Sequence, residues 1–345
     1  MPIPDRYRSE HAAEWSYRPH AAELAALAGD WRHRHRIRPA ATDDFRIHLL
    51  LVDLQRDFCL PEGSLYVGGR SGRGALDDSD RLARFLYRNL DRISEISATL
   101  DTHQPYQIFS PEFWVDREGA PLTAHHELSA AEVRAGEVRP APGLASWLAP
   151  NGDDGWLERQ ALAYCEALEA TGRYRLYLWP PHCLLGGEGH CLVGVVEEAM
   201  LFHAWTRQVP PRLQTKGSNP LTESYSALGP EVAETFDGRP LGRRKTALIA
   251  RLLAADAIVV SGQAASHCVK STVEDLLAEA LAVDPSGARK IWLLTDCMSS
   301  VAVPDPDRAG EYRFDFTPEA EAAFARFEAA GCRLLRSTEP LPDGA

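Results

Sequence analysis

The sequence predicts an α/β protein in which helices cover both faces of a parallel sheet. Short apolar runs, typical of strands that are buried on both faces, recur from residue 45 onward. Stretches with apolar residues at helical spacing separate several of these runs. Strands that alternate with helices favour parallel pairing, and reactive groups in such sheets gather outside the carboxyl ends of the strands.

The predicted strands begin with FRIHLLLVDLQ, a continuous apolar run over residues 45–55. Six shorter runs follow, and most of them end at or next to a polar or charged residue. They are ISATLD (96–101), YRLYLW (174–179), RLQTK (212–216), AIVVSG (257–262), KIWLLTD (290–296) and CRLLR (332–336).

The predicted helices lie between these runs. Leu82, Phe85, Leu86 and Ile93 recur near helical spacing and predict a helix over residues 78–93. Further helices are expected over residues 155–170, 192–207, 243–254, 268–282 and 317–330.

Two segments depart from this pattern. Residues 1–44 form an N-terminal extension, whose basic cluster WRHRHRIRP (31–39) we interpret as a solvated surface, because most charge runs are solvated. Residues 104–172 contain clusters of Pro, Gly, Asn and Asp, which predict an insertion with a short helix near 129–135. We therefore expect one domain over 45–345 that carries the insertion and follows the extension.

The composition is that of a soluble globular protein. Of 345 residues, 45% are hydrophobic and 25% charged. No apolar run reaches the roughly 18 residues of a membrane helix, and the first ten residues lack a signal segment. The net charge of −12 disfavours nucleic acid as a partner. We expect a cytoplasmic protein that binds neither nucleic acid nor membranes, and its seven cysteines to be free thiols.

Cys268 is the candidate nucleophile. It lies where the run 257–262 turns through small residues into a predicted helix. A helix N-terminus lowers the pKa of a thiol, and backbone N–H groups in such a turn can bind an oxyanion. Asp53 could accept the thiol proton and Lys216 could stabilise the negative charge, whereas a buried inert cysteine is the alternative interpretation.

A second group of residues suits a divalent metal ion. Asp101 and His103 follow a predicted strand two residues apart, and His182 follows two prolines that restrict the backbone. One carboxylate and two imidazoles form a set that zinc, iron or manganese accepts, with positions left open for water or substrate.

Five segments, taken together, resemble the isochorismatase-like cysteine hydrolases, and within them the nicotinamidase/pyrazinamidase branch. They occur in the family's order, and the resemblance covers residues 45–103 and 173–337. The segments are LLLVDLQRDFCLPEGSLYV (49–67), LDTH (100–103), WPPHC (179–183), TKG with a later ESYS (215–217 and 223–226) and SGQAASHCV (261–269).

The resemblance implies a three-layer α/β/α fold around a six-stranded parallel sheet, and a Cys–Asp–Lys triad. The triad residues matched are Cys268, Asp53 and Lys216, and the matched metal ligands are Asp101, His103 and His182, with zinc as the expected ion and iron or manganese as alternatives.

The resemblance also implies a substrate pocket. Phe58 and Trp179 match an aromatic pair that encloses a pyridine ring, and a cis peptide is expected at Gln263–Ala264. The backbone N–H groups of Ala264 and Cys268 match the oxyanion donors.

The implied reaction is hydrolysis of a small, aromatic carboxamide such as nicotinamide to the acid and ammonia, through a thioester on Cys268. Other amidases of this fold act on maleamate, ureidoacrylate or carbamoyl substrates, and these stay open as alternatives. A zinc-stabilised, catalytically inactive binding protein is the alternative from another class. The resemblance further implies a homo-oligomer.

Several positions depart from the family pattern. Ser266 stands where an aspartate is common, and the segment after the lysine is longer. Some members have a further metal-binding histidine where this chain reads QIFS (107–110). His125 and His126 in the insertion could replace it, although we prefer to interpret them as two exposed loop residues.

Overall fold

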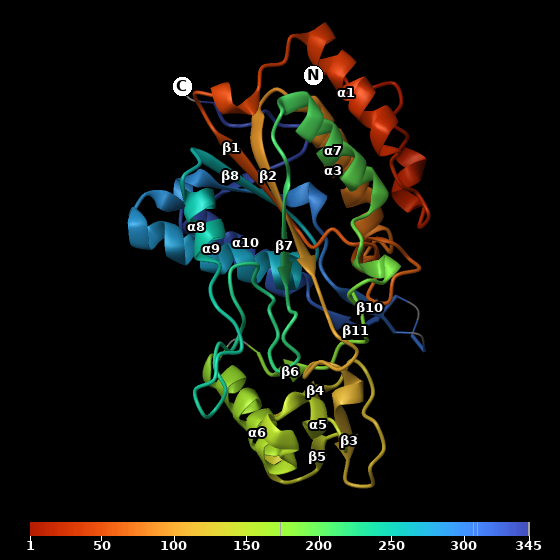
Figure 1. Ribbon diagram of the computed structural model, residues 1–345, viewed down its shortest axis with the longest axis vertical. Coiled ribbons are helices and arrows are strands. Elements are labelled where there is room, and N and C mark those ends of the chain that lie inside the picture. The colour runs from red at the N-terminus through yellow and green to blue at the C-terminus, as the bar shows by residue number, and fades with distance from the viewer. Residues whose placement is uncertain (173, 306, 309, 344–345) are drawn as a thin grey trace.

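The computed structural model describes residues 1–172, 174–305, 307–308 and 310–343. Its centre is a six-stranded parallel sheet with helices on both faces, so the predicted three-layer α/β/α fold is confirmed (Figure 1). In spatial order the strands are β12 (Arg333–Leu335), β9 (Ile291–Leu294), β8 (Ala257–Gly262), β1 (Ile47–Val52), β2 (Ile93–Asp101) and β7 (Arg212–Lys216).

Most predicted helices are present within a few residues of their predicted bounds. On one side of the sheet are α3 (Gly74–Arg88) and α7 (Gly194–Arg207), and on the other are α8 (Thr246–Leu253), α9 (Lys270–Val283) and α10 (Thr317–Ala329). The end predicted for α3 is wrong, because Ile93 begins β2 and pairs with Ile47 instead. No helix among the described residues is long and apolar enough to span a membrane.

The run YRLYLW (174–179) was expected to be a strand of the central sheet, and this prediction is wrong. Only Leu176–Tyr177 (β6) is extended, and it pairs antiparallel with Glu127–Leu128 (β4) outside the sheet. The edge at which it could have joined β2 is already taken, because β2 pairs with β1 on one side and β7 on the other.

The N-terminal extension packs against the domain. Its helix α1 (Ala21–His35) lies along α7, where Leu24 and Ala28 are fully buried (Figure 1). The basic cluster ends this helix and places Ile37 in the core, while most of its charged side chains keep contact with solvent.

The insertion forms a lobe beyond the carboxyl end of the sheet (Figure 1). A capping box between Ser129 and Glu132 starts its short helix, which confirms the helix predicted near 129–135. The lobe contains α4 (Ala130–Arg134), α5 (Ala145–Leu148), α6 (Asp154–Ala170) and an antiparallel pair of short strands, β3 (Trp114–Asp116) and β5 (Val138–Pro140).

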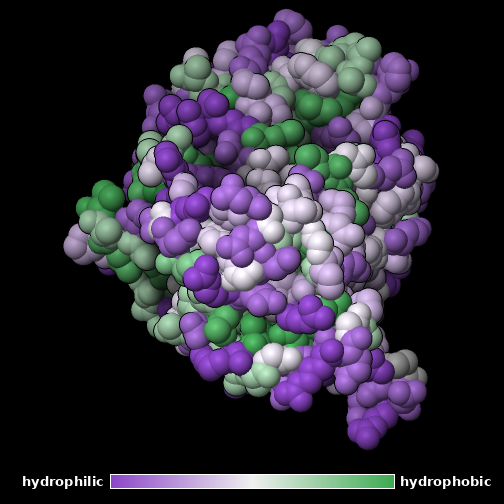
Figure 2. Space-filling view, turned by 60° about the horizontal axis from the view of Figure 1, so that its bottom comes forward, coloured by the Kyte–Doolittle hydropathy of each residue, from purple (hydrophilic) through white to green (hydrophobic). Residues whose placement is uncertain are grey.

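A second stretch of extra length reaches the same lobe. Residues 217–245, which we call the connecting segment, join β7 to α8 without a helix or strand of their own. Their tip packs on α6, where the Phe236 N–H donates to Gln160 Oε1 at 3.0 Å. Figure 2, in which the lobe end comes forward, shows a largely hydrophilic surface with separate hydrophobic groups.

The remaining elements border the carboxyl end of the sheet. They are the short helix α2 (Arg56–Cys59) after β1, and a hairpin of β10 (Ala302–Pro304) with β11 (Tyr312–Asp315).

Two buried histidines predict that the free energy of unfolding falls in mild acid. Burial lowers the pKa of His48 and of His203 to about 4, and their neutral rings contact Ser97 Oγ and the Ile93 carbonyl, each at 2.9 Å. An unfolded histidine titrates near a pKa of about 6.5, so between these values only the unfolded chain takes up the protons. Each histidine should lower the free energy of unfolding by about 1.4 kcal/mol per pH unit in this window.

Urea denaturation of the protein and of His203→Gln, followed across this pH window, checks the expectation. The variant should lose stability less steeply as the pH falls. Equal slopes for the two proteins would contradict the assignment of His203.

Candidate active site

The predicted reactive residues meet at the carboxyl end of the sheet. Asp53 follows β1 with a left-handed φ of 49°, and Asp101 and Lys216 end β2 and β7, where they are paired in register. Cys268 lies in a π-helical turn, Ala265–Val269, that connects β8 to α9. All four residues are buried, as expected where parallel strands are covered on both faces.

The Lys216 ammonium connects the other three groups. Its Nζ lies 2.9 Å from Asp53 Oδ2, 3.0 Å from Asp101 Oδ1 and 3.5 Å from Cys268 Sγ. One carboxylate atom of Asp53, one of Asp101 and the sulfur of Cys268 all lie within 4.8 Å of one another. The structure therefore brings the predicted triad together.

The expected low pKa of the Cys268 thiol is wrong. Burial raises the pKa of Cys268, Lys216 opposes this shift, and the carboxylates of Asp53 and Asp101 add to it. The helix-end rule fails here because it describes an accessible thiol, whereas this one is buried between two carboxylates. Burial also raises the pKa of Asp53, against the attraction of Lys216, which makes this carboxylate a better proton acceptor.

The carboxylates of Asp53 and Asp101, which flank Lys216, keep its side chain charged. Burial alone would lower the pKa of Lys216, but Asp101 and Asp53 outweigh burial and raise it. Burial alone would raise the pKa of Asp101, but the Lys216 ammonium opposes this effect, and the pKa lies well below its usual value.

Two supporting residues were missed from the sequence. Thr99 Oγ1 donates to Asp53 Oδ1 at 2.5 Å, and Gln55 hydrogen-bonds both the N–H and the C=O of Asp101, at 2.6 and 2.8 Å. A usable signal existed for Thr99, which lies two residues before Asp101 and so on the same face of the strand.

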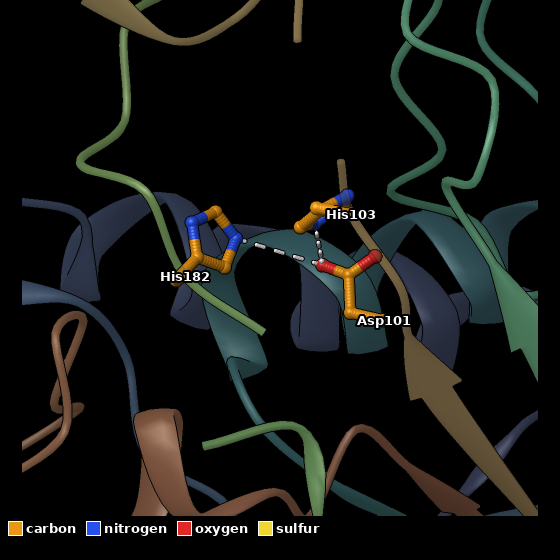
Figure 3. Close-up of side chains that lie close together, drawn as sticks. All are labelled: Asp101, His103 and His182. Carbon is orange, nitrogen blue, oxygen red and sulfur yellow. Dashed lines mark ion pairs between the residues drawn. The ribbon is translucent and has the colours of Figure 1, made fainter. Parts of the chain in front are cut away.

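Asp101, His103 and His182 face one another across a small gap (Figure 3). Asp101 Oδ2 lies 3.0 Å from His103 Nε2 and 3.7 Å from His182 Nε2. Atoms of the three side chains all lie within 4.8 Å of one another.

The chemistry of these atoms fits a metal ion. His103 Nδ1 lies 3.2 Å from the Gly217 carbonyl and His182 Nδ1 lies 2.8 Å from the Pro180 carbonyl, so each ring donates its N–H there. Each Nε2 then presents a lone pair toward Asp101, and His103 Nε2 has no hydrogen-bond partner among the described residues. Burial lowers the pKa of His103, which favours the neutral ring that binds metals. A divalent cation would remove the repulsion among these three acceptors.

The candidate replacements for a further histidine lie away from this set. The His125 ring packs near Trp179, with centroids 6.2 Å apart, and His126 Nε2 lies 3.6 Å from Glu132. Gln107, from the QIFS stretch, lies closer. Its Nε2 donates to the Gly217 carbonyl at 3.2 Å, and its buried Oε1 has no hydrogen-bond partner in the described chain.

Gly217 is required by this crowding. Its φ is +75°, and a Cβ there would lie 2.7 Å from the His103 ring and 2.8 Å from Asp101 Oδ1. The glycine of the TKG motif therefore lets the backbone approach Asp101 and His103 closely.

A small cavity opens onto both groups of residues. Phe58 and Trp179, the predicted aromatic pair, both contribute to its wall, and the Phe58 ring lies 5.3 Å from the ring of His182. The other lining residues are Leu65, Val67, Asp101, His182, Glu223, Tyr225, Ala264, His267, Cys268 and Val301.

The turn beside Cys268 is held in place by side chains. The peptide Gln263–Ala264 is cis, as expected. The Gln263 amide donates to Asp78 and accepts from the Ser299 N–H, at 2.9 and 3.2 Å. The Ala264 N–H has no acceptor among the described residues, so it is free to bind a negative oxygen.

Comparisons with known proteins agree with the predicted resemblance. No model of a known protein family matches the chain. The nicotinamidase of Escherichia coli (strain K12) is 32% identical over 162 residues, which are 45% of this chain and 56% of that protein. The chain thus spans about half the length of the curated relative that it matches.

Solved structures extend the similarity to the fold. A nicotinamidase/pyrazinamidase from Acinetobacter baumanii superposes with a TM-score of 0.51 at 16% identity, covering 86% of this chain and 99% of that one. The yeast nicotinamidase bound to nicotinaldehyde covers 84% and 99%, with 18% identity and a TM-score of 0.49. The first of these shows that the chain has the nicotinamidase fold.

Proposed function

We propose that this chain, which resembles nicotinamidases in sequence and in fold, hydrolyses a small aromatic carboxamide such as nicotinamide to the acid and ammonia. One observation carries the proposal: a single aromatic-walled cavity is bordered by Cys268 on one side and by Asp101 and His182 on another. A ring bound between the aromatic walls can therefore reach a metal site and a nucleophile at the same time.

In the proposed reaction the chain's own residues move one proton and one acyl group. Asp53 takes the proton from the Cys268 thiol, and the sulfur adds to the carboxamide carbon. The N–H groups of Ala264 and Cys268 stabilise the resulting oxyanion, and one such donor is worth about 3 kcal/mol. Asp53 returns the proton to the leaving ammonia, and water hydrolyses the remaining thioester.

Asp101, His103 and His182 would hold a divalent metal ion, zinc in the first place, with iron or manganese as alternatives. Such an ion, when bound, supplies positive charge to a ring nitrogen or to water. Trp179 closes the pocket in a fixed orientation, because its Nε1 donates to the Tyr225 hydroxyl at 2.7 Å.

A panel of amides tests the activity. We expect ammonia release from nicotinamide or pyrazinamide with a higher kcat/KM than from maleamate, ureidoacrylate or carbamoylsarcosine, because the pocket walls are aromatic. Preference for one of the last three would favour the alternative amidase. Absence of release from all five, in protein that contains metal, would refute the amidase proposal and favour the inactive metal-stabilised protein.

A further inference from the structure

Helix α6 of the insertion lobe binds the connecting segment through one face. Trp156, Gln160 and Tyr164 are four residues apart and therefore lie on the same side of the helix. Trp156 Nε1 donates to Asp237 at 2.9 Å, and Gln160 Oε1 accepts from the Phe236 N–H at 3.0 Å. Both of these bonds hold the distant tip of the segment.

The third bond holds the part of the segment that reaches the active site. The Tyr164 hydroxyl accepts from the Glu223 N–H at 3.0 Å. The next residue, Ser224, accepts from Lys216 Nζ through its carbonyl at 2.8 Å. The residue after that, Tyr225, accepts from Trp179 Nε1 through its hydroxyl at 2.7 Å.

These contacts lie in the interior. Tyr164 is 1% exposed, and Glu223 and Tyr225 are each 6% exposed. Water cannot readily replace the Tyr164 hydroxyl as the acceptor for Glu223, because a buried N–H that loses its partner stays unpaired. The position of residues 223–225 therefore depends on this bond more than the position of an exposed loop would.

We propose that Tyr164 is a positioning residue, which fixes Lys216 and Trp179 through the backbone and side chain of residues 223–225. The inference rests on the proposed function of the site. It makes the insertion lobe part of the machinery that places the lysine beside Cys268 and the indole against the substrate ring.

The geometry explains why a small displacement matters. Lys216 Nζ is 3.5 Å from Cys268 Sγ, and the Ser224 carbonyl is its one backbone acceptor among the described residues. A shift of this carbonyl moves the ammonium relative to the sulfur and the carboxylates. Displacements of about 1 Å in a catalytic arrangement can cost about a hundredfold in rate.

The test compares Tyr164→Phe with Gln160→Met. Each substitution keeps the bulk of the side chain and removes the acceptor of one N–H of the connecting segment, but only the first acts on residues 223–225. The Tm should fall more in Tyr164→Phe, because Glu223 is buried, whereas Phe236 is exposed and water can replace its lost acceptor. The kcat for the best amide should fall by about tenfold or more in Tyr164→Phe and stay within about twofold in Gln160→Met.

A second readout does not depend on turnover. The rate of Cys268 alkylation by iodoacetamide is measured as a function of pH by mass spectrometry of the Cys268 peptide. Compared with the unmodified protein, this pH profile should shift in Tyr164→Phe and stay the same in Gln160→Met. Equal effects of the two substitutions on kcat and on alkylation, or no effect of Tyr164→Phe on either, would overturn the proposal. If the unmodified protein hydrolyses no amide, the proposed function fails, and the alkylation comparison alone decides the role of Tyr164.

Discussion

Substitution of Cys268 by alanine should abolish ammonia release and leave the protein folded. We expect kcat/KM to fall by at least about four orders of magnitude, as for other nucleophiles that form covalent intermediates. Of the seven cysteines, all of which lie in the described part of the chain, Cys268 alone lines the cavity. No second thiol can therefore take over the attack on the carboxamide carbon.

A matched variant controls for the loss of a buried thiol. Cys59 is fully buried on α2, next to Phe58, but does not line the cavity. Cys59→Ala should keep kcat within a few-fold of the unmodified protein, although it leaves a small void. Rapid quenching and intact-mass measurement should detect the acyl group on the unmodified protein and on Cys59→Ala. Ammonia release by Cys268→Ala at a comparable rate would refute the nucleophile assignment.

Substitution of His103 by alanine should remove the metal ion. The set would keep only Asp101 and His182. Substitution of a residue that merely hydrogen-bonds a metal ligand typically lowers metal affinity by about tenfold to a hundredfold, so loss of a direct ligand should lower it by at least as much. Metal content after dialysis, and the visible absorption of the cobalt-loaded protein, measure this directly. Amide hydrolysis should fall together with the metal content.

His190 provides the matched control. Its Nε2 lies 2.9 Å from the Thr102 hydroxyl, one residue from His103, but it is not among the residues that face one another in the metal set. His190→Ala should therefore bind metal as the unmodified protein does. Equal metal content in the His103 and His190 variants would contradict the assigned ligands.

The sequence predicted which residues lie together better than it predicted their burial and pKa values. Asp53, Asp101 and Lys216 were candidates because each lies at or near the end of a predicted strand, and parallel strands bring such ends together at one edge of the sheet. The pKa of Cys268 was predicted wrongly, because a local rule about helix ends takes no account of burial between two carboxylates.

Contacts between distant segments were beyond the reach of sequence patterns. The run 174–179 has the composition of a strand, yet only Leu176–Tyr177 is extended, and it pairs with β4 outside the sheet. Nothing in the sequence linked Tyr164 with Glu223, because their bond depends on how two separate segments fold together. The division into an extension and a domain, the homo-oligomer, the cytoplasmic location and the lack of nucleic-acid or membrane partners stay predictions.

Asp101 belongs to both halves of the site. Its Oδ1 pairs with Lys216 and its Oδ2 faces the two histidines. A cation bound at Oδ2 would withdraw negative charge from Oδ1 and so weaken the ion pair between Oδ1 and Lys216 Nζ. The interactions of Lys216 Nζ with Asp53 and with the Cys268 sulfur would then carry more of its stabilisation. Ligand occupancy on one side and proton affinity on the other are thus thermodynamically linked, and by reciprocity a change in the protonation of the triad alters the affinity of the neighbouring site.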